Sequence, residues 1–200
     1  DNTAVGRNAG TNITTAIRNT AIGDLALATN TTGHYNTAVG GYSSRYLTTG
    51  TRNTTLGYQA GENITTGAYN TFLGERAGNN TTTALNNTVV GSGAYNVATT
   101  GTNNVAMGQS ALVNCTTGSQ NTAVGYQAGN DLTTGGNNTA LGRMALHSAT
   151  TVDANVSIGY NTMYNSTAGY QVAVGANALH INTTGTQNVA VGYNAMHDNT

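Results

Sequence analysis

Polar and apolar residues follow one another along this chain in an order that repeats every 17 residues. The recurring word is Asn, a β-branched residue, a mostly small residue, an apolar residue and Gly, as in Asn121-Thr-Ala-Val-Gly125. Nine consecutive steps are 17 residues, the next is 16 and the last is 17 again. The sequence therefore predicts one continuous repeat array over residues 1–200, without a linker or a second domain. Its units begin at residues 2, 19, 36, 53, 70, 87, 104, 121, 138, 155, 171 and 188.

Position 1 is the Asn of an idealised unit that runs N-T-A-V-G-Y-Q-A-G-x-N-x-T-T-G-x-N. Position 2 is always Thr or Val, and position 4 is apolar in every unit. Because alternate residues of a strand share a face, these positions predict a short strand whose position 4 faces a core. The predicted core column is Val5, Ile22, Val39, Leu56, Leu73, Val90, Met107, Val124, Leu141, Ile158, Val174 and Val191.

Position 5 is Gly in all twelve units. This indicates a backbone angle or a close chain approach that a side chain would prevent, so we expect the chain to turn there. Position 8 is Ala in ten units, with Ser43 and Thr162 the exceptions, which predicts tight packing. The predicted turn glycines are Gly6, Gly23, Gly40, Gly57, Gly74, Gly91, Gly108, Gly125, Gly142, Gly159, Gly175 and Gly192.

Position 13 is Thr from Thr14 to Thr200, and position 14 is nearly always Thr. Gly usually follows, which predicts a second short strand and a turn. A unit of this length is too short for two helices, and a 3.6-residue period is missing. We predict an all-β fold, a parallel β-solenoid with one 17-residue coil per unit and about twelve coils, in which equivalent positions stack about 4.8 Å apart.

The composition agrees with stacking of identical residues. Asn and Thr make up about a third of the chain, and an Asn side chain can both donate to and accept from the Asn of the next coil. We expect polar ladders at positions 1 and 13. Neither end of the sequence shows a polar cap, so we expect a segment of a longer protein.

Charge, hydropathy and cysteine content exclude several classes of partner, a membrane helix and a disulfide framework. The chain has 13 charged residues and a formal net charge of −1, so nucleic acid and anionic membrane surfaces are not expected as partners. No apolar run is long enough for a membrane helix, and we expect no membrane insertion within this segment. The single Cys115 excludes an internal disulfide framework.

Several words resemble known fibre repeats. Asn104-Val-Ala-Met-Gly108, Asn155-Val-Ser-Ile-Gly159 and Asn188-Val-Ala-Val-Gly192 resemble the repeat of trimeric autotransporter adhesin heads, and residues 121–129 resemble words in repetitive bacteriophage tail fibres. The resemblance implies a left-handed parallel β-roll and a homotrimer, with the small and apolar columns facing the core and the trimer axis. It transfers no binding residues. The adhesin repeat is usually a few residues shorter, and the added T-T-G segment predicts a larger loop or strand.

Catalytic motifs are missing from the sequence, and no pair of acidic residues converges. Asp24 and Glu75 share position 6 but lie three coils apart, and Glu62 and Asp153 fall in other columns. We therefore expect no enzyme and no cofactor. His147, His180 and His197 share position 10 and are the candidate metal ligands, because imidazoles meeting at a trimer axis suit zinc, nickel or iron. The alternative is a variable, mostly polar column without a metal.

The position-6 tyrosines and Cys115 also leave two interpretations open. Tyr58, Tyr126, Tyr160 and Tyr193 either stack on sugar rings or cover a neighbouring coil. Cys115 at position 12 is expected to be a small packed side chain rather than a reactive thiol.

The uniform columns favour a structural protein. We expect the shaft of a phage tail fibre or cell-surface fibre, which supports host attachment from an extracellular or virion surface. The alternative is an adhesin module whose coil loops bind a host-surface glycan or receptor directly. A less favoured third class is an ice-binding solenoid that uses the Thr columns, although adjacent strand residues point to opposite faces.

Overall fold

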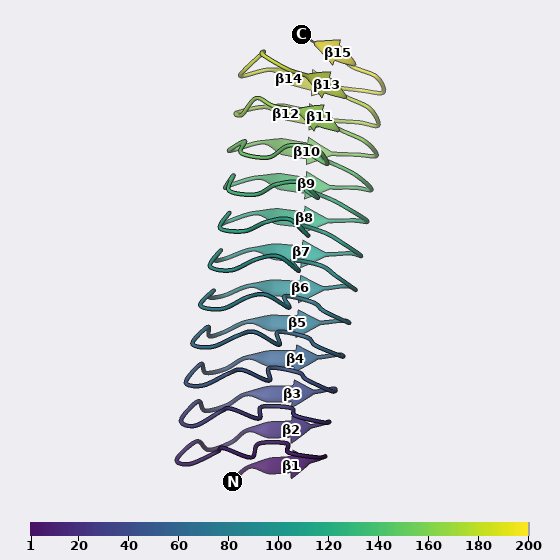
Figure 1. The fold of residues 1–200 in the computed structure, drawn as a ribbon. Coiled ribbons are helices and arrows are strands. Elements are labelled where there is room, and N and C mark those ends of the chain that lie inside the picture. The colour runs from purple at the N-terminus through teal and green to yellow at the C-terminus, as the bar shows by residue number, and fades with distance from the viewer. Residues whose placement is uncertain (200) are drawn as a thin grey trace.

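The computed structural model describes residues 1–199 and confirms the all-β parallel solenoid. Each repeat unit makes one coil, and about twelve coils stack from the N-terminus to the C-terminus (Figure 1). No residue between 1 and 199 lies in a helix. Thr200, the last member of the position-13 column, lies outside the described residues.

One parallel sheet runs through every coil, and a smaller sheet joins it at the C-terminal end. The 12-stranded sheet has the order β1-β2-β3-β4-β5-β6-β7-β8-β9-β10-β12-β14, and the 3-stranded sheet has the order β11-β13-β15 over residues 1–199. The strands of the large sheet are β1 (Thr3–Val5), β2 (Thr20–Ile22), β3 (Thr37–Val39), β4 (Thr54–Leu56), β5 (Thr71–Leu73), β6 (Thr88–Val90), β7 (Val105–Met107), β8 (Thr122–Val124), β9 (Thr139–Leu141), β10 (Val156–Ile158), β12 (Val172–Val174) and β14 (Val189–Val191). Those of the small sheet are β11 (Asn165–Ser166), β13 (Ile181–Asn182) and β15 (Asp198–Asn199).

The strand register follows the repeat column by column. β1 pairs with β2 so that Thr3 lies opposite Thr20 and Val5 opposite Ile22. The 16-residue unit keeps this register, because Val156 still pairs with Val172. Its missing residue is absorbed between Thr167 and Gln171, a stretch that belongs to neither sheet. The sheet is therefore insensitive to small changes in coil length elsewhere.

The large sheet buries position 3 and exposes positions 2 and 4. Ala21, Ala38 and Phe72 at position 3 are completely buried, whereas Leu56 at position 4 is 48% exposed. A three-residue strand has one inward side chain, and in most coils a small residue fits there. The large Phe72 fits because position 9 of its coil is Gly78, where an added Cβ atom would lie 2.5 Å from the Phe72 ring. The prediction that position 4 forms the core of the chain was wrong. None of its members is buried: Val5, Ile22, Val39, Leu56, Leu73, Val90, Met107, Val124, Leu141, Ile158, Val174 and Val191.

The core is completed by positions 8, 9 and 12. Position 8 is small and buried, as predicted, from Ala26 to Ala178. Positions 9 and 12 fill the rest of the coil reciprocally: Gly61 accompanies Ile64, whereas Leu146 accompanies Ala149. A Cβ atom on Gly61 would lie 2.7 Å from Cδ1 of Ile64, so these two positions share one space. Sequence analysis missed this pairing, although the inverse sizes of the two columns could have revealed it.

The position-5 glycines turn the chain at the end of each strand, as predicted. Their φ angles lie between 129° and 140°, a region that disfavours side chains. A Cβ atom on Gly125 would lie 2.5 Å from the carbonyl oxygen of Gly142 in the next coil. Both reasons for glycine that the sequence suggested, the backbone angle and the close approach, apply at this turn.

The position-1 column forms the expected ladder of buried amides. The Oδ1 atom of Asn19 accepts the backbone N–H of Asn36 at 2.8 Å, and Nδ2 of Asn36 lies 3.2 Å from the same oxygen. That Nδ2 atom also donates to the carbonyl oxygen of Gly50 at 2.9 Å. The amide therefore joins successive coils and also closes its own coil. Paired in this way, it avoids the cost of about 1 to 3 kcal/mol for an unsatisfied buried group.

The expected second strand differs from the observed one. Positions 13 and 14 form a bend, and the second strand lies at positions 11 and 12, starting with β11 in the 16-residue coil. Position-13 hydroxyls bond backbone rather than one another: Thr48 Oγ1 donates to the carbonyl oxygen of Thr65 at 3.1 Å. The threonine column is thus a side-chain-to-backbone ladder on the wall away from the large sheet.

Candidate functional site

The outward side of the large sheet is the first surface with functional potential. We call it the sheet face and define it as the side chains at positions 2 and 4 of every coil. Its threonine, valine, isoleucine, leucine and methionine side chains include Ile22 at 39% exposure and Val191 at 69%. No charged residue occurs at either position in twelve coils. This surface can bury itself only against another largely apolar surface.

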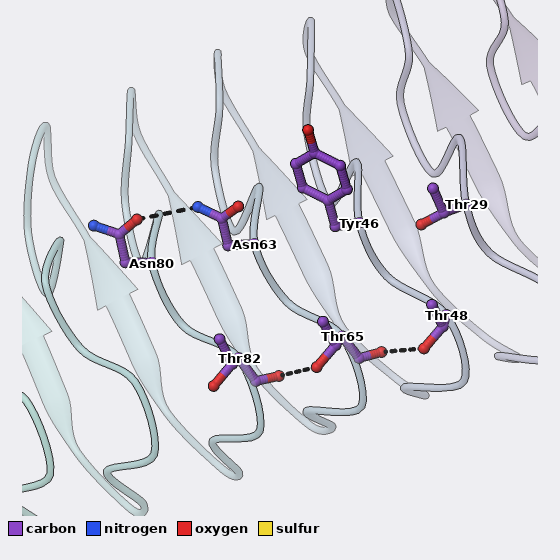
Figure 2. Close-up of a pocket in the computed structure, with 7 residues that line it drawn as sticks. All are labelled: Thr29, Tyr46, Thr48, Asn63, Thr65, Asn80 and Thr82. Atoms are coloured by element: carbon purple, nitrogen blue, oxygen red, sulfur yellow. Dashed lines mark hydrogen bonds between the residues drawn. The ribbon is translucent and has the colours of Figure 1, made fainter.

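A groove on the opposite wall is the second surface. It has a volume of about 710 Å³ and lies between the position-11 and position-13 columns of successive coils (Figure 2). We call it the tyrosine groove, because Tyr46 is its one aromatic residue. The side chains that line it are Thr29, Tyr46, Thr48, Asn63, Thr65, Asn80 and Thr82.

Hydrogen bonds order the polar side chains of the tyrosine groove. Thr65 Oγ1 donates to the carbonyl oxygen of Thr82 at 3.2 Å, which continues the ladder from Thr48. On the other side, Asn63 Nδ2 donates to Asn80 Oδ1 at 3.0 Å. Two parallel rows of polar side chains therefore run along the stack, and Tyr46 stands at one end of the Asn row (Figure 2).

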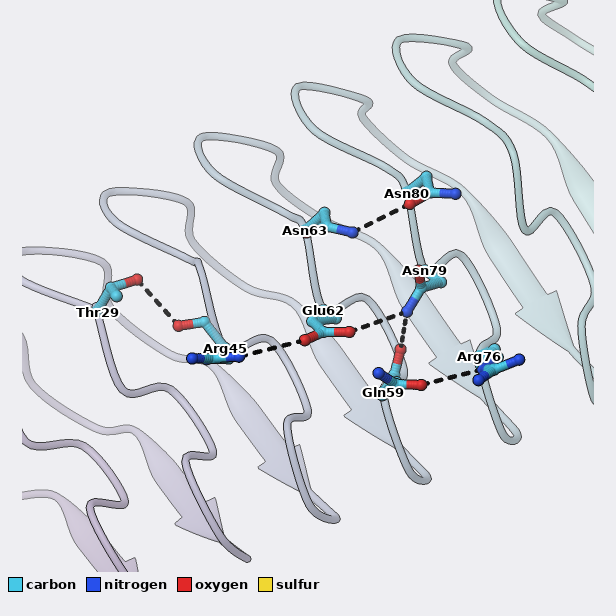
Figure 3. A network of polar contacts seen from close by, with 8 residues as sticks. All are labelled: Thr29, Arg45, Gln59, Glu62, Asn63, Arg76, Asn79 and Asn80. Atoms are coloured by element: carbon cyan, nitrogen blue, oxygen red, sulfur yellow. Dashed lines mark hydrogen bonds and ion pairs between the residues drawn. The ribbon is translucent and has the colours of Figure 1, made fainter.

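A second hollow of about 340 Å³ continues past Tyr46 toward the N-terminus and shares Thr29 and Tyr46 with the groove. Beside both hollows lies a chain of polar contacts (Figure 3). Arg45 Nη1 lies 3.8 Å from Glu62 Oε1, and Asn79 Nδ2 lies 3.3 Å from Glu62 Oε2. The charges next to the groove are thus paired with each other.

The position-10 histidines stack instead of converging. His147, Tyr164, His180 and His197 form one column with ring centroids 4.7, 5.4 and 4.8 Å apart and nearly parallel planes. Ring nitrogens point their lone pairs within the ring plane, so parallel rings do not aim them at one ion. Over residues 1–199, no three His, Cys, Asp or Glu side chains are grouped closely enough to hold a metal.

Burial perturbs this histidine column. Desolvation lowers the pKa of His147 and of His180, and His197 lowers that of His180 further. Nδ1 of His180 is buried without a hydrogen-bond partner, whereas Nδ1 of His197 lies 2.8 Å from Asp198 Oδ1. Within one chain the geometry is that of a packed aromatic ladder. The meeting of imidazoles from three chains at a trimer axis stays a prediction.

The other candidate side chains make structural contacts. The guanidinium of Arg143 lies over the rings of Tyr126 and Tyr160, at 5.7 and 5.4 Å from their centroids, so these position-6 tyrosines cover a neighbouring coil. Tyr58 packs edge-on against Tyr42. Tyr193 in the last coil is 76% exposed.

Cys115 is a packed side chain, as the sequence suggests. It is completely buried, and burial raises the pKa of its thiol to about 12. A thiol that stays protonated at neutral pH is a poor nucleophile.

Two of the acidic side chains, Asp24 and Glu62, are paired with arginines. Asp24 accepts hydrogen bonds from Arg7 Nε at 2.9 Å and Nη2 at 2.8 Å, and these bonds lower the pKa of Asp24. Glu62 is held by Arg45. Asp24 is thus an ion-pair partner at the surface of the stack, whereas Glu62 is a nearly buried one.

Comparison with known proteins adds no assignment. In residues 1–199, no helix has the length and the apolar character that a membrane span needs. No family model matches the chain, and neither a curated protein nor a solved structure shows significant similarity to it. The function therefore has to be argued from the sheet face and the tyrosine groove.

Proposed function

We propose that this chain forms the shaft of a virion or cell-surface fibre, in which three copies pack their sheet faces around a common axis. The observation that supports the proposal is the uninterrupted apolar column at position 4, which points outward in the single chain. In the single chain this column leaves a continuous apolar strip in contact with water, and a partner surface would cover it.

The kind of sheet also favours a covered face. Parallel sheets occur almost always with both faces buried, and here the single chain covers only the inner face. Sheet-face side chains such as Leu56 and Leu141 remain 48% and 45% exposed. Burial of apolar area stabilises by roughly 25 cal/mol per Å², so an interface over the whole stack would add a large stabilisation.

A second copy of the same chain is the natural cover for this face. The columns repeat at each coil, so two stacks aligned in parallel bring equivalent apolar side chains together along their whole length. Three copies close a ring around an axis and leave no free sheet face. The resemblance of the Asn-Val-Ala-Met-Gly words to trimeric adhesin heads supports the number three.

A rod of this kind keeps an attached tip away from a virion or cell. Each coil contacts only its neighbours, so length can be set by the number of coils without a change in the cross-section. We therefore place the fibre on an extracellular or virion surface, where it supports attachment to a host or another surface.

Light scattering of the purified chain tests the proposal. The mass should be three times the 20.3 kDa of one chain. The double variant Leu56→Lys with Leu73→Lys should be monomeric, because it places unpaired charges on adjacent coils of the sheet face. The matched control, Thr66→Lys with Thr83→Lys, puts the same charges on exposed position-14 sites of the same coils and should remain trimeric.

Circular dichroism of both variants should retain the β signal, since all four positions point away from the core. A monodisperse monomer of the unaltered chain would overturn the trimeric shaft. So would equal dissociation of the two double variants.

A further inference from the structure

The tyrosine groove is a feature that the shaft does not require. A rod needs only uniform columns, yet position 11 holds Thr29, Tyr46, Asn63 and Asn80 in four successive coils and Val97 in the fifth. The groove lies where this run faces the threonines of position 13. It therefore marks one section of the stack, although the fold itself continues unchanged.

The groove stays accessible in the proposed fibre. Positions 11 and 13 point outward on the wall opposite the large sheet, while position 12, including the buried Ile64, points inward. Association through positions 2 and 4 leaves this wall free. A ligand can thus lie along the outside of the shaft, parallel to its axis.

The free hydrogen-bonding groups of the groove suit hydroxyl groups. The hydroxyl groups of Thr48 and Thr65 donate their hydrogen bonds to backbone carbonyl oxygens, so toward a ligand these oxygens can act only as acceptors. In the amide pair, Asn63 Oδ1 remains an acceptor and Asn80 Nδ2 remains a donor. A ligand with many hydroxyl groups can both donate to the threonine row and accept from the asparagine row.

Tyr46 supplies an apolar platform beside these polar rows. Its side chain is 39% exposed, and the Arg45 guanidinium lies 4.8 Å from the ring centroid, which holds the ring in place. The remaining ring surface can stack on a flat face of C–H groups. Sugar rings combine such a face with a rim of hydroxyl groups.

Charge selects a neutral ligand. None of the seven lining residues is ionised at neutral pH, and the nearest cation, Arg45, is paired with Glu62. An acidic ligand in the groove would find no cation among the lining residues. The groove thus lacks the charge that carboxylate, sulfate or phosphate recognition requires.

The shape of the groove selects an extended ligand. Its lining residues come from consecutive coils, so the groove is straight and its polar groups recur at the strand spacing of about 4.8 Å. This spacing is comparable with the length of one sugar residue in an extended β-linked chain. A helical α-linked chain would leave the straight rows after a few residues.

We infer that the tyrosine groove binds an extended, neutral, β-linked oligosaccharide segment, with Tyr46 stacking on one sugar ring and the threonine and asparagine rows binding the hydroxyl groups of the following sugars. The site goes beyond the shaft function and does not depend on it. A fibre with this groove would engage a surface glycan along its side.

Isothermal titration of the full chain with cellohexaose tests the inference. We expect saturable binding that weakens roughly tenfold in Tyr46→Ala, which corresponds to one stacking contact. Thr65→Val, which keeps the shape and removes the hydroxyl group, should weaken binding severalfold. The matched control Tyr170→Ala removes an exposed tyrosine that lies outside the groove, and it should bind like the unaltered chain.

Two further probes examine shape and charge. Maltohexaose, a helical α-linked chain, should bind more weakly than cellohexaose, and so should the acidic hexamer of galacturonic acid. Equal or tighter binding of either probe would overturn the inference, as would absence of cellohexaose binding or equal binding by Tyr46→Ala and Tyr170→Ala. Light scattering of the same samples reports the trimer separately, so failure of one proposal is distinguishable from failure of the other.

Discussion

The two walls of each coil follow different rules. On the wall of the large sheet, positions 1 to 5 repeat almost the same residues in every coil, because each side chain meets its own copy above and below. On the opposite wall, position 13 stays Thr but positions 9 to 12 change from coil to coil, and a large residue at position 9 accompanies a small one at position 12. On the sheet wall, the residue at each position is determined by contacts with the same position in the neighbouring coils. On the opposite wall, it is determined by the other residues of its own coil.

This difference explains where function can develop in such a rod. A substitution on the sheet wall affects the backbone contacts with both neighbouring coils. A second substitution in the same coil therefore cannot compensate for it. A change on the opposite wall can be balanced by a second change three residues away in the same coil. The tyrosine groove and the histidine stack both lie on the opposite wall.

The largest effect should come from a side chain at position 5. Gly125→Val places a Cβ atom 2.5 Å from the carbonyl oxygen of Gly142 at a φ of 136°, so we expect a loss of about 4 kcal/mol or more. Melting followed by circular dichroism should show the loss. Hydrogen exchange should locate it in the coils that contain residues 108–142.

The control for this variant is a glycine without such constraints. Gly93 at position 7 has a φ of 63°, and the nearest atom to an added Cβ is Ser110 Oγ at 3.9 Å. Since Asn tolerates this backbone region, Gly93→Asn should melt close to the unaltered chain. Equal melting of Gly125→Val and Gly93→Asn would refute the special constraint on the sheet wall.

An intermediate effect should come from positions 9 and 12, and it should be reversible. Leu146→Gly empties part of the core and should cost about 3 kcal/mol. Ala149→Leu alone should overpack the same space and cost about 2 kcal/mol. Together they reproduce the Gly129 and Leu132 arrangement of the preceding coil, so the double variant should recover at least half of the loss.

A double-mutant cycle on thermal or denaturant unfolding measures this compensation. Strictly additive losses at residues 146 and 149 would mean that the opposite wall is not adapted within each coil. The distinction between the two walls would then lose its basis.

The smallest effect should be a pH dependence confined to the histidine stack. Because burial lowers the folded-state pKa of His147 and His180, the unfolded chain binds more protons below its own pKa of about 6.5. Stability of the last coils is therefore complete above that pH and decreases below it. Tyr164, His197, Asp131 and Asp198 are the other ionisable groups next to these rings.

Amide protection factors measured at pH 7 and pH 5 should show a selective decrease in the C-terminal coils. His180→Asn, which places a residue found elsewhere in this column, should reduce that dependence. A uniform response of all coils, or an unchanged response in His180→Asn, would contradict the assignment to the histidine stack.

Much of the coil could be predicted from the repeat. The period determines the number of coils, and the glycine and asparagine columns mark the turn and the ladder, because a repeated steric or polar demand leaves a repeated residue. Whether position 4 faces the core or the outside of the coil could not be predicted from its apolar residues alone. An aliphatic column is required equally by a core and by an interface, and Leu56 lies in the outer one.

The backbone of the turns was the second feature that the sequence did not reveal. Positions 7, 9 and 17 adopt positive φ with residues as different as Leu27, Tyr35 and Arg76. Such residues disfavour this region, and the inter-coil hydrogen bonds impose it, for instance from the N–H of Leu27 to the carbonyl oxygen of Ser43 at 3.1 Å. The tyrosine groove was likewise unpredictable, since it needs the placement of two columns relative to each other.

The asparagine ladder also gives the rod a direction. From Asn19 to Asn70, each Nδ2 atom points to the Oδ1 atom of the preceding coil, so the side-chain dipoles align instead of cancelling. One end of any such stack presents unpaired amide donors and the other presents unpaired acceptors. Two stacks joined head to tail satisfy both sets, whereas two joined head to head set like groups against each other. The ladder therefore has a polarity, and it favours head-to-tail joining of two stacks.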